Sequence, residues 1–255
     1  MRVNWLISLL FVGLTASWLP AQGEPDDFAA EVLERFDLAL DKGYVDQLQE
    51  AVQDIDLVYE KVSDKTRKKL NKALAGMLTS KPRQTIGEDG QSPEQLLSPS
   101  YAGAIGILHD KPGGVEILRK ALKSKHLKEW YDVRGLLYEG IALSLDPDDI
   151  SLIAKGLAEP DAYLVATAAG SLAIYSDQDV DVRREAIEEL IDGWEALVET
   201  AEKNERREKG SEAREFLDQV EPALIEAAGD ITRRRQSDLD ALREWFAETG
   251  KGDAW

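Results

Sequence analysis

The stretch that decides the fold is residues 162–175, AYLVATAAGSLAIY, which is apolar around nearly its whole helical circumference. A helix of this kind has to be covered by protein on several sides, because no face of it suits water. We therefore expect it to be the central helix of its region, with amphipathic helices on either side. Pro160 precedes it, and Asp161 is placed to cap its first turn.

Apolar residues recur with helical periodicity on both sides of this stretch, from Phe28 to Ala247. No segment shows the alternation and turn residues of a β-hairpin. The intervening loops are short, which places neighbouring helices antiparallel. The sequence thus predicts an all-α fold. The expected helices are 28–40, 45–62, 65–78, 101–109, 114–123, 130–145, 148–158, 162–175, 181–201, 211–220, 222–230 and 238–248.

One long polar interval divides the chain. Residues 80–100 contain three Pro and two Gly, and we expect a loop there. Pro222 suits the first turn of a helix better than its interior, so a break is expected before it. The predicted organisation is a signal peptide (1–23), N-terminal helical hairpins (24–80), a loop (81–100), a repeat region (101–249) and a tail (250–255).

Two of the predicted helices open with the same tripeptide, DVR, at 132–134 and at 181–183. Short apolar helices, 117–122 and 152–157, precede the openings at Asp132 and Asp161. The Asp can cap free N–H groups, the Val can pack inward, and the Arg can meet an Asp of the neighbouring unit. A two-helix unit with a period of about 30 residues or more resembles a HEAT repeat.

The closing segment, residues 223–249, is similar to the last repeat of exported bacterial HEAT-repeat proteins. The resemblance covers about residues 101–249 and implies an α-solenoid of stacked antiparallel helix pairs, HEAT/armadillo-like. Residues 143–147, LSLDP, also resemble the end of a tetratricopeptide unit, which would again be an α-solenoid. A capping repeat has to seal the open end of such a stack. The stripe expected to do so is Leu239, Leu242, Trp245 and Phe246.

Residues 1–23 have the features of a secretory signal peptide. Arg2 supplies the positive charge, Trp5 to Leu14 is apolar, and the small-x-small pattern places cleavage between Gly23 and Glu24. An uncleaved anchor is the alternative, but the apolar stretch is shorter than the roughly 20 residues that span a bilayer. We expect an exported protein, periplasmic or extracellular, with no membrane span after cleavage.

The composition excludes some kinds of covalent chemistry and some classes of partner. The chain has 255 residues, with 49 Asp and Glu against 31 Lys and Arg, a formal net charge of −18, and no Cys. Disulfides and thiolate chemistry are therefore excluded. A surface this acidic repels phosphate backbones, so we expect no nucleic-acid partner.

No catalytic or cofactor motif is found. His109 and His126 are far apart in sequence and lack metal-ligand spacing, so each is expected at a helix end. We predict no cofactor and no enzymatic activity. A calcium loop is a weaker alternative to simple helix capping, because the glycine that its sharp turn needs is replaced by Val182. Its acids would be Asp177, Asp179, Asp181 and Glu188.

The function expected of such a stack is binding of a protein or peptide along the surface formed by the second helix of each pair. The helices assigned to that surface are 131–145, 162–175 and 181–197. Two alternatives stay open: an all-α exported hydrolase using paired carboxylates, and a calcium-regulated adhesion or matrix protein. The residues expected to be exposed for binding are Tyr138, Glu139, Arg184 and Glu188.

Overall fold

The computed structural model describes residues 24–82, 91–205, 210–250 and 255, and within these residues the fold is all-α without a β-strand. Short 3-10 helices link several of the α-helices, and a π-helical turn follows the last one. The α-helices are α1 (Pro25–Lys42), α2 (Val45–Tyr59), α3 (Asp64–Thr79), α4 (Pro93–Leu108), α5 (Gly114–Leu122), α6 (Tyr131–Ala142), α7 (Ile150–Ala154), α8 (Ala162–Ala173), α9 (Val180–Glu205), α10 (Gly210–Thr232) and α11 (Leu239–Trp245).

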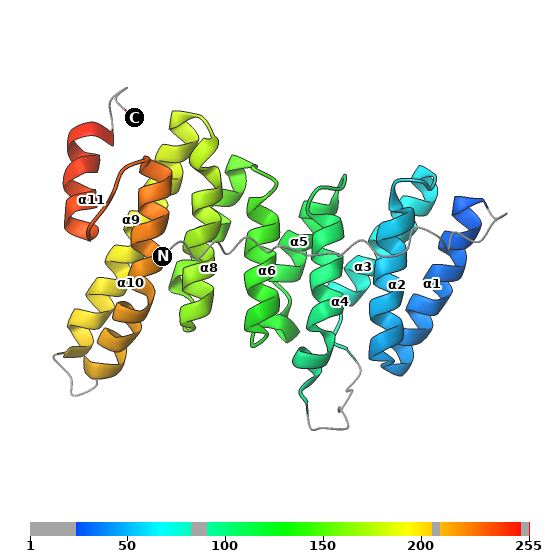
Figure 1. Ribbon diagram of the computed structural model, residues 1–255. Coiled ribbons are helices and arrows are strands. Elements are labelled where there is room, and N and C mark those ends of the chain that lie inside the picture. The colour runs from blue at the N-terminus through cyan, green and yellow to red at the C-terminus, as the bar shows by residue number, and fades with distance from the viewer. Residues whose placement is uncertain (1–23, 83–90, 206–209, 251–254) are drawn as a thin grey trace.

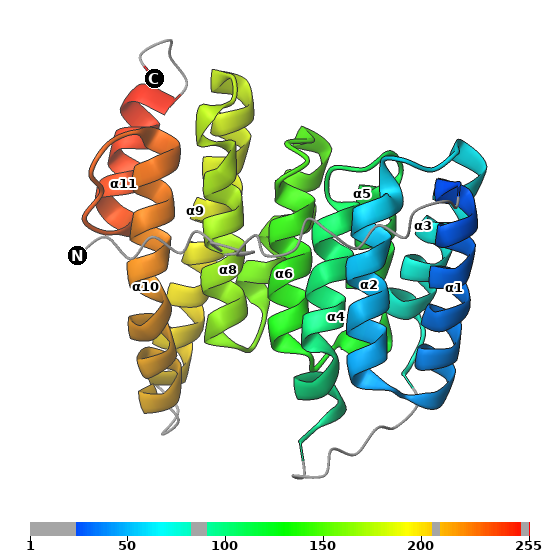
Figure 2. The ribbon, with the colours of Figure 1, turned by 45° about the vertical axis from the view of Figure 1, so that its right-hand side comes forward.

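The helices pack in two layers that follow the order of the chain (Figure 1). In one layer α2 contacts α4, α4 contacts α6, α6 contacts α8, and α8 contacts α10. In the other, α1 contacts α3, α3 contacts α5, α7 contacts α9, and α9 contacts α11. Figure 2 shows the same row of even-numbered helices after rotation. Each helix thus packs against its near neighbours in sequence.

The gap between α5 and α7 in the second layer is bridged by an ion pair. Arg119, on α5, donates from Nε to the Asp149 carboxylate at 2.7 Å and from Nη2 to Asp146 at 2.6 Å. Both acids belong to the turn before α7. Asp149 is 2% exposed and therefore buried, whereas 27% of the Arg119 side chain remains exposed.

Helix α8 has the central position predicted for residues 162–175. It packs against α6, α7, α9 and α10. Leu164, Val165, Ala168 and Leu172 are fully buried, while Tyr163 remains 45% exposed. The prediction of a helix covered on several sides is confirmed.

The prediction of a loop over residues 80–100 is wrong in its second half, because α4 begins at Pro93. Ser92 and Gln95 form a capping box, in which the Gln95 N–H donates to Ser92 Oγ and the Ser92 N–H donates to Gln95 Oε1. Pro93 occupies the first helical turn, where its missing N–H costs nothing. Pro99 then lies inside the helix. Part of the expected loop, 83–90, lies outside the described residues.

The expected break before Pro222 is also wrong, because α10 runs through it. Val220 and Leu224, on either side of the proline, are fully buried. The packing of α10 against α8 and α9 compensates for the hydrogen bond that the proline cannot donate. The predicted helix 148–158 is likewise interrupted, with α7 between two 3-10 turns.

The shared DVR tripeptide does not mark equivalent helices. Helix α6, which carries Asp132, lies in the even-numbered layer, whereas α9, which carries Asp181, packs against α7 and α11 in the other. The assignment of residues 181–197 to the same surface as 131–145 and 162–175 is therefore wrong. The helix paired with α8 in that layer is α10.

The capping and register roles expected of the tripeptide are only partly correct. Asp161 caps α8, since its carboxylate accepts from the Leu164 N–H at 3.2 Å. Asp132 lies in the first turn of α6, and the N-cap residue, Trp130, makes no side-chain cap. Arg134 meets an acid of the next unit, but that acid is Glu159 rather than an Asp.

The ends of the chain are described only in part. Leu239 and Leu242 of the predicted closing stripe are buried, and Trp245 and Phe246 pack against the core. The predicted signal peptide, including Gly23, and residues 251–254 of the tail lie outside the described residues. Glu24 directly precedes α1. None of the described helices is long and apolar enough to cross a membrane.

Candidate functional site

Tyr138, expected as an exposed contact, is buried at 2% exposure. Its hydroxyl donates to Glu159 Oε1 at 3.0 Å, and Arg134 Nη2 donates to that hydroxyl at 3.4 Å. Arg134 also forms an ion pair with Glu159. Tyr138 therefore belongs to a buried polar network between α6 and the turn before α8, and the prediction of a surface role is wrong.

Tyr163, on α8, is an exposed tyrosine of this region. Its ring lies over Gly135, where a Cβ atom would come within 2.8 Å of Tyr163 Cε1. Glu139 is half-buried near it, and burial raises the pKa of the Glu139 carboxyl. Burial is also the largest of the influences that raise the pKa of Tyr163, and the charges of Asp132 and Glu139 add to it. Tyr163 and Glu139 thus share one acidic patch on the even-numbered layer.

Arg184 and Glu188 lie on α9, in the other layer, so they are not on the same helix layer as Glu139. Arg184 pairs with Asp181 at 2.7 Å and lies over the Trp255 ring, 5.9 Å from its centroid. Glu188 is exposed. The four residues predicted for binding are therefore split between the two layers.

The acids of the alternative calcium loop have other arrangements. Asp177 forms an ion pair with Arg233 at 3.1 Å, and Asp181 forms the pair with Arg184. Asp181 and Glu188 are already within α9, which begins at Val180. Across the part of the chain that the structure describes, no group of three or more His, Asp or Glu side chains is placed to hold a metal ion. These four acids therefore do not come together as such a group in the described residues.

Both histidines lie near helix ends, as predicted. His109 caps the C-terminus of α4, with Nδ1 2.7 Å from the Gly106 carbonyl oxygen. His126 lies in the 3-10 turn η1 (Lys125–Leu127), between α5 and α6. Its Nε2 atom is buried and has no hydrogen-bond partner among the described residues.

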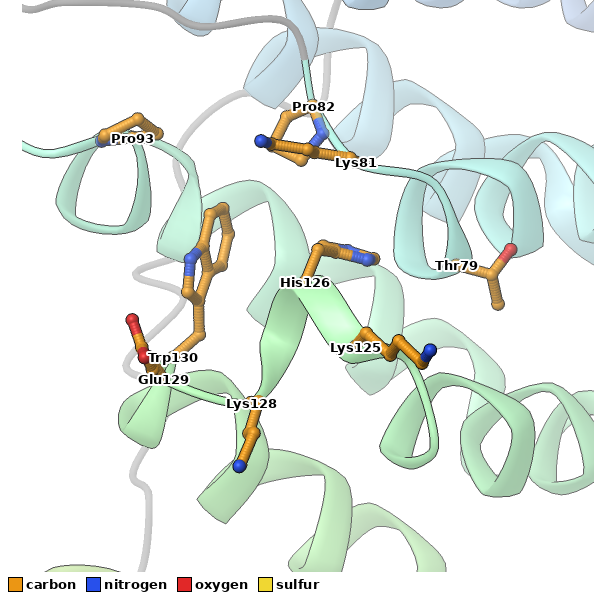
Figure 3. A pocket seen from close by; sticks show the side chains of 9 residues that line it. All are labelled: Thr79, Lys81, Pro82, Pro93, Lys125, His126, Lys128, Glu129 and Trp130. Atoms are coloured by element: carbon orange, nitrogen blue, oxygen red, sulfur yellow. The ribbon is translucent and has the colours of Figure 1, made fainter.

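His126 belongs to a cavity of about 670 Å³ that the sequence analysis did not predict (Figure 3). We call it the basic pocket. It forms where the end of α3, the start of α4 and the η1 segment meet. In Figure 3 Lys81 and Pro82 lie opposite the segment that carries Lys125 and Lys128. The lining residues are Thr79, Lys81, Pro82, Pro93, Lys125, His126, Lys128, Glu129 and Trp130.

The pocket carries more positive than negative charge. Three lysines line it against one acid, Glu129. Lys81, Lys125 and Lys128 are exposed, and none of them forms an ion pair with another described residue. Burial, and after it the charge of Lys81, lowers the pKa of His126 below its ordinary value. Both influences disfavour the charged imidazole.

Trp130 gives the pocket an apolar wall. Its ring packs against Tyr101, with centroids 5.2 Å apart, and meets His126 edge-on at 6.2 Å. Tyr101 is fully buried, and its hydroxyl donates to the Met77 carbonyl oxygen at 2.9 Å. The indole is thus held in place by core residues. With Pro82 and Pro93 it forms an apolar surface beside the lysines.

A second cavity, of about 640 Å³, lies between α9, α10 and the turn before α8. Small and apolar residues dominate its lining, among them Leu157, Gly193, Leu197 and Phe216. Its charged lining residues are Glu159 and Glu212, so it does not share the positive charge of the basic pocket. The basic pocket is therefore the better candidate for a selective site.

Comparison of the chain with protein-family models, with curated proteins and with solved structures gave no match.

Proposed function

We propose that this protein is an exported α-solenoid, resembling HEAT-repeat proteins, that binds a protein or peptide segment and catalyses no reaction. The observation that carries the proposal is the two-layer packing, in which each helix contacts the next helix of its own layer except between α5 and α7, where the ion pair of Arg119 bridges the gap. Stacked helix pairs of this kind present long surfaces that suit extended partners. The signal-like residues 1–23 support export.

The even-numbered layer supplies a second argument. Tyr163 is 45% exposed beside Glu139, and exposed aromatic side chains are frequent anchors of protein interfaces. The absence of a Cβ atom at Gly135 lets the Tyr163 ring pack closely against α6, and this contact restrains the side chain before any partner binds. A partner that contacts α6 and α8 together would cover Tyr163.

The test is affinity capture with the tagged full-length chain from the exported fraction of its host. We expect a partner that wild type enriches and that Tyr163→Ala loses. Tyr44→Ala is the matched control, because Tyr44 is 49% exposed but lies at the start of α2. A partner equally enriched by both variants would contradict the role of Tyr163, and the absence of any enriched partner would contradict the proposal.

One observation favours the hydrolase alternative. The backbone N–H groups of Tyr131 and Asp132 lie near the Glu94 carboxyl and favour its charged form, but other influences outweigh them. Burial, and after it the charge of Asp132, raises the pKa of Glu94. A carboxyl with a raised pKa beside a second acid is the arrangement that acid–base hydrolysis uses. The nearness of these N–H groups also explains Glu94 as a partner of the start of α6, whose N-cap residue makes no side-chain cap.

The two explanations of Glu94 predict different results. A hydrolase would turn over a panel of nitrophenyl glycosides and esters, and both Glu94→Gln and Asp132→Asn would abolish that turnover. A helix cap would give no turnover in wild type, and Glu94→Gln would lower the melting temperature. We expect the second result.

A further inference from the structure

We propose that the basic pocket binds an acidic peptide segment, with carboxylates held by the lysines and an apolar side chain packed against Trp130. This inference rests on the proposed peptide-binding function and assigns to it a site and a class of ligand. It does not involve Tyr163, which lies on α8 outside the lining of the pocket.

Charge is the first argument. The chain as a whole carries −18, whereas the pocket brings three lysines against one glutamate. An acidic segment is repelled by most of the surface and attracted here, so the charge pattern selects both the ligand and the place of binding. The three ammonium groups are exposed and have no carboxylate partner within the described residues.

The origin of the lysines is the second argument. Lys81 follows α3, whereas Lys125 and Lys128 belong to the segment between α5 and α6. Each lysine is a compact charge on a flexible stem and can meet a carboxylate from several directions. Lysines on opposite sides of a cavity therefore suit a segment with more than one acidic side chain.

The apolar wall and the size of the pocket are the third argument. Trp130 is fixed by Tyr101 and His126, and Pro93 lies beside it (Figure 3). This surface favours an apolar or aromatic side chain next to the acids. A volume of about 670 Å³ lies within the range of about 300–1,000 Å³ typical of ligand sites, and it far exceeds the size of one inorganic anion.

The experiment is fluorescence anisotropy of a labelled peptide, EEFEE, titrated with the full-length chain. QQFQQ is the neutral peptide of the same shape. The pocket variant is Lys81→Gln/Lys125→Gln/Lys128→Gln. The control variant, Lys61→Gln/Lys65→Gln/Lys68→Gln, removes the same charge. Lys68 is the nearest of these three lysines to the pocket residue Thr79, and it lies roughly 16 Å from Thr79 along α3 at about 1.5 Å per residue. Circular dichroism verifies that both variants are folded.

We expect saturable binding of EEFEE, no saturation with QQFQQ, and a loss of affinity of about tenfold or more in the pocket variant, because three charge-assisted contacts are removed. The control variant should change the affinity by less than about threefold, since exposed charges at that distance are screened. Equal losses in both variants, equal binding of the two peptides, or no binding of EEFEE would overturn the proposal.

Two further arms separate other anions from the peptide. Inorganic phosphate, or vesicles of phosphatidylcholine with phosphatidylserine, would displace EEFEE at equal concentration if the pocket were a general phosphate site, and that result would also overturn the proposal. A partner captured by wild type and lost with Tyr163→Ala, together with no binding of EEFEE, would leave the proposed function standing and remove only the acidic-peptide site.

Discussion

The guanidinium of Arg183 donates two hydrogen bonds to the carbonyl oxygen of Ile231, from Nε at 2.9 Å and from Nη2 at 2.6 Å. Ile231 lies in the last turn of α10, where carbonyl groups have no partner within the helix. Arg183 lies in the first turn of α9 and is 3% exposed. A buried side chain thus fixes the end of one helix against the beginning of the helix that precedes it.

Arg183→Met should therefore lower the free energy of unfolding by about 1–3 kcal/mol, because the Ile231 carbonyl oxygen is left buried without these donors. The measurement is urea unfolding followed by circular dichroism. Arg214→Met is the control, since Arg214 lies on the surface of α10 and 54% of its side chain is exposed. A loss no larger than that of the control would contradict the structural role of Arg183.

The helical fold was largely predictable, because burial of an apolar face imposes a period that the sequence carries directly. Residues 162–175 indicated a covered helix, and α8 is one. The start of α4 was missed because three prolines and two glycines in 80–100 outweighed a local signal, the capping box of Ser92 and Gln95. A capping box is indicated by only two residues, whereas the loop was inferred from the composition of the whole interval.

The candidate site was much harder to predict. Lys81 is separated from Lys125 and Trp130 by the hairpin of α4 and α5, and only the packing of α3, α4 and α5 brings the three residues to one cavity. The prediction that Tyr138 is exposed was wrong for a related reason. A tyrosine amid charges suggests a surface, but those charges, Arg134 and Glu159, are its own buried partners. The packing of Tyr163 depends on Gly135, the small residue that its ring faces. The two residues are far apart in the sequence, so their contact could not be predicted from it.

The ion pair between α5 and the turn before α7 gives a second prediction. Asp149→Ala should destabilise the fold by about 3 kcal/mol, at the lower end of the range for broken buried pairs because 27% of the Arg119 side chain remains exposed. Asp218→Ala, which breaks the exposed pair with Arg214, should cost about 0–1 kcal/mol. Urea unfolding of both variants measures the difference. Equal effects would mean that Asp149 is not the link described above.

Two glycines should respond to alanine with opposite signs. At Gly114 a Cβ atom would lie 1.9 Å from the Leu108 carbonyl oxygen, so the backbone has to move and the fold should lose about 1–3 kcal/mol. At Gly106, inside α4, a Cβ atom meets nothing within 4 Å. Gly106→Ala should stabilise the fold by about 0.5–1 kcal/mol through its higher helix propensity. Melting temperatures that move in the same direction for both variants would contradict this packing.

The pH dependence of stability should reveal His126. Its pKa is lowered in the folded chain, so as the pH falls below the ordinary value of 6.5 the unfolded chain takes up the proton first. The stability that neutral His126 contributes is therefore complete above 6.5 and is lost as the pH falls through the lower, folded value. His126→Gln should remove this part of the pH dependence.

The pKa of His126 itself is measured by NMR titration of its ring protons in the full-length chain, with His109→Gln used to assign the two histidines. We expect a value below 6.5, because burial and the neighbouring Lys81 both disfavour the charged imidazole. Lys81→Gln should move the value part of the way back toward 6.5, and Lys61→Gln, far from the ring in sequence and exposed, should not. A pKa above 6.5 in wild type would mean that a carboxylate rather than a lysine dominates this wall of the pocket.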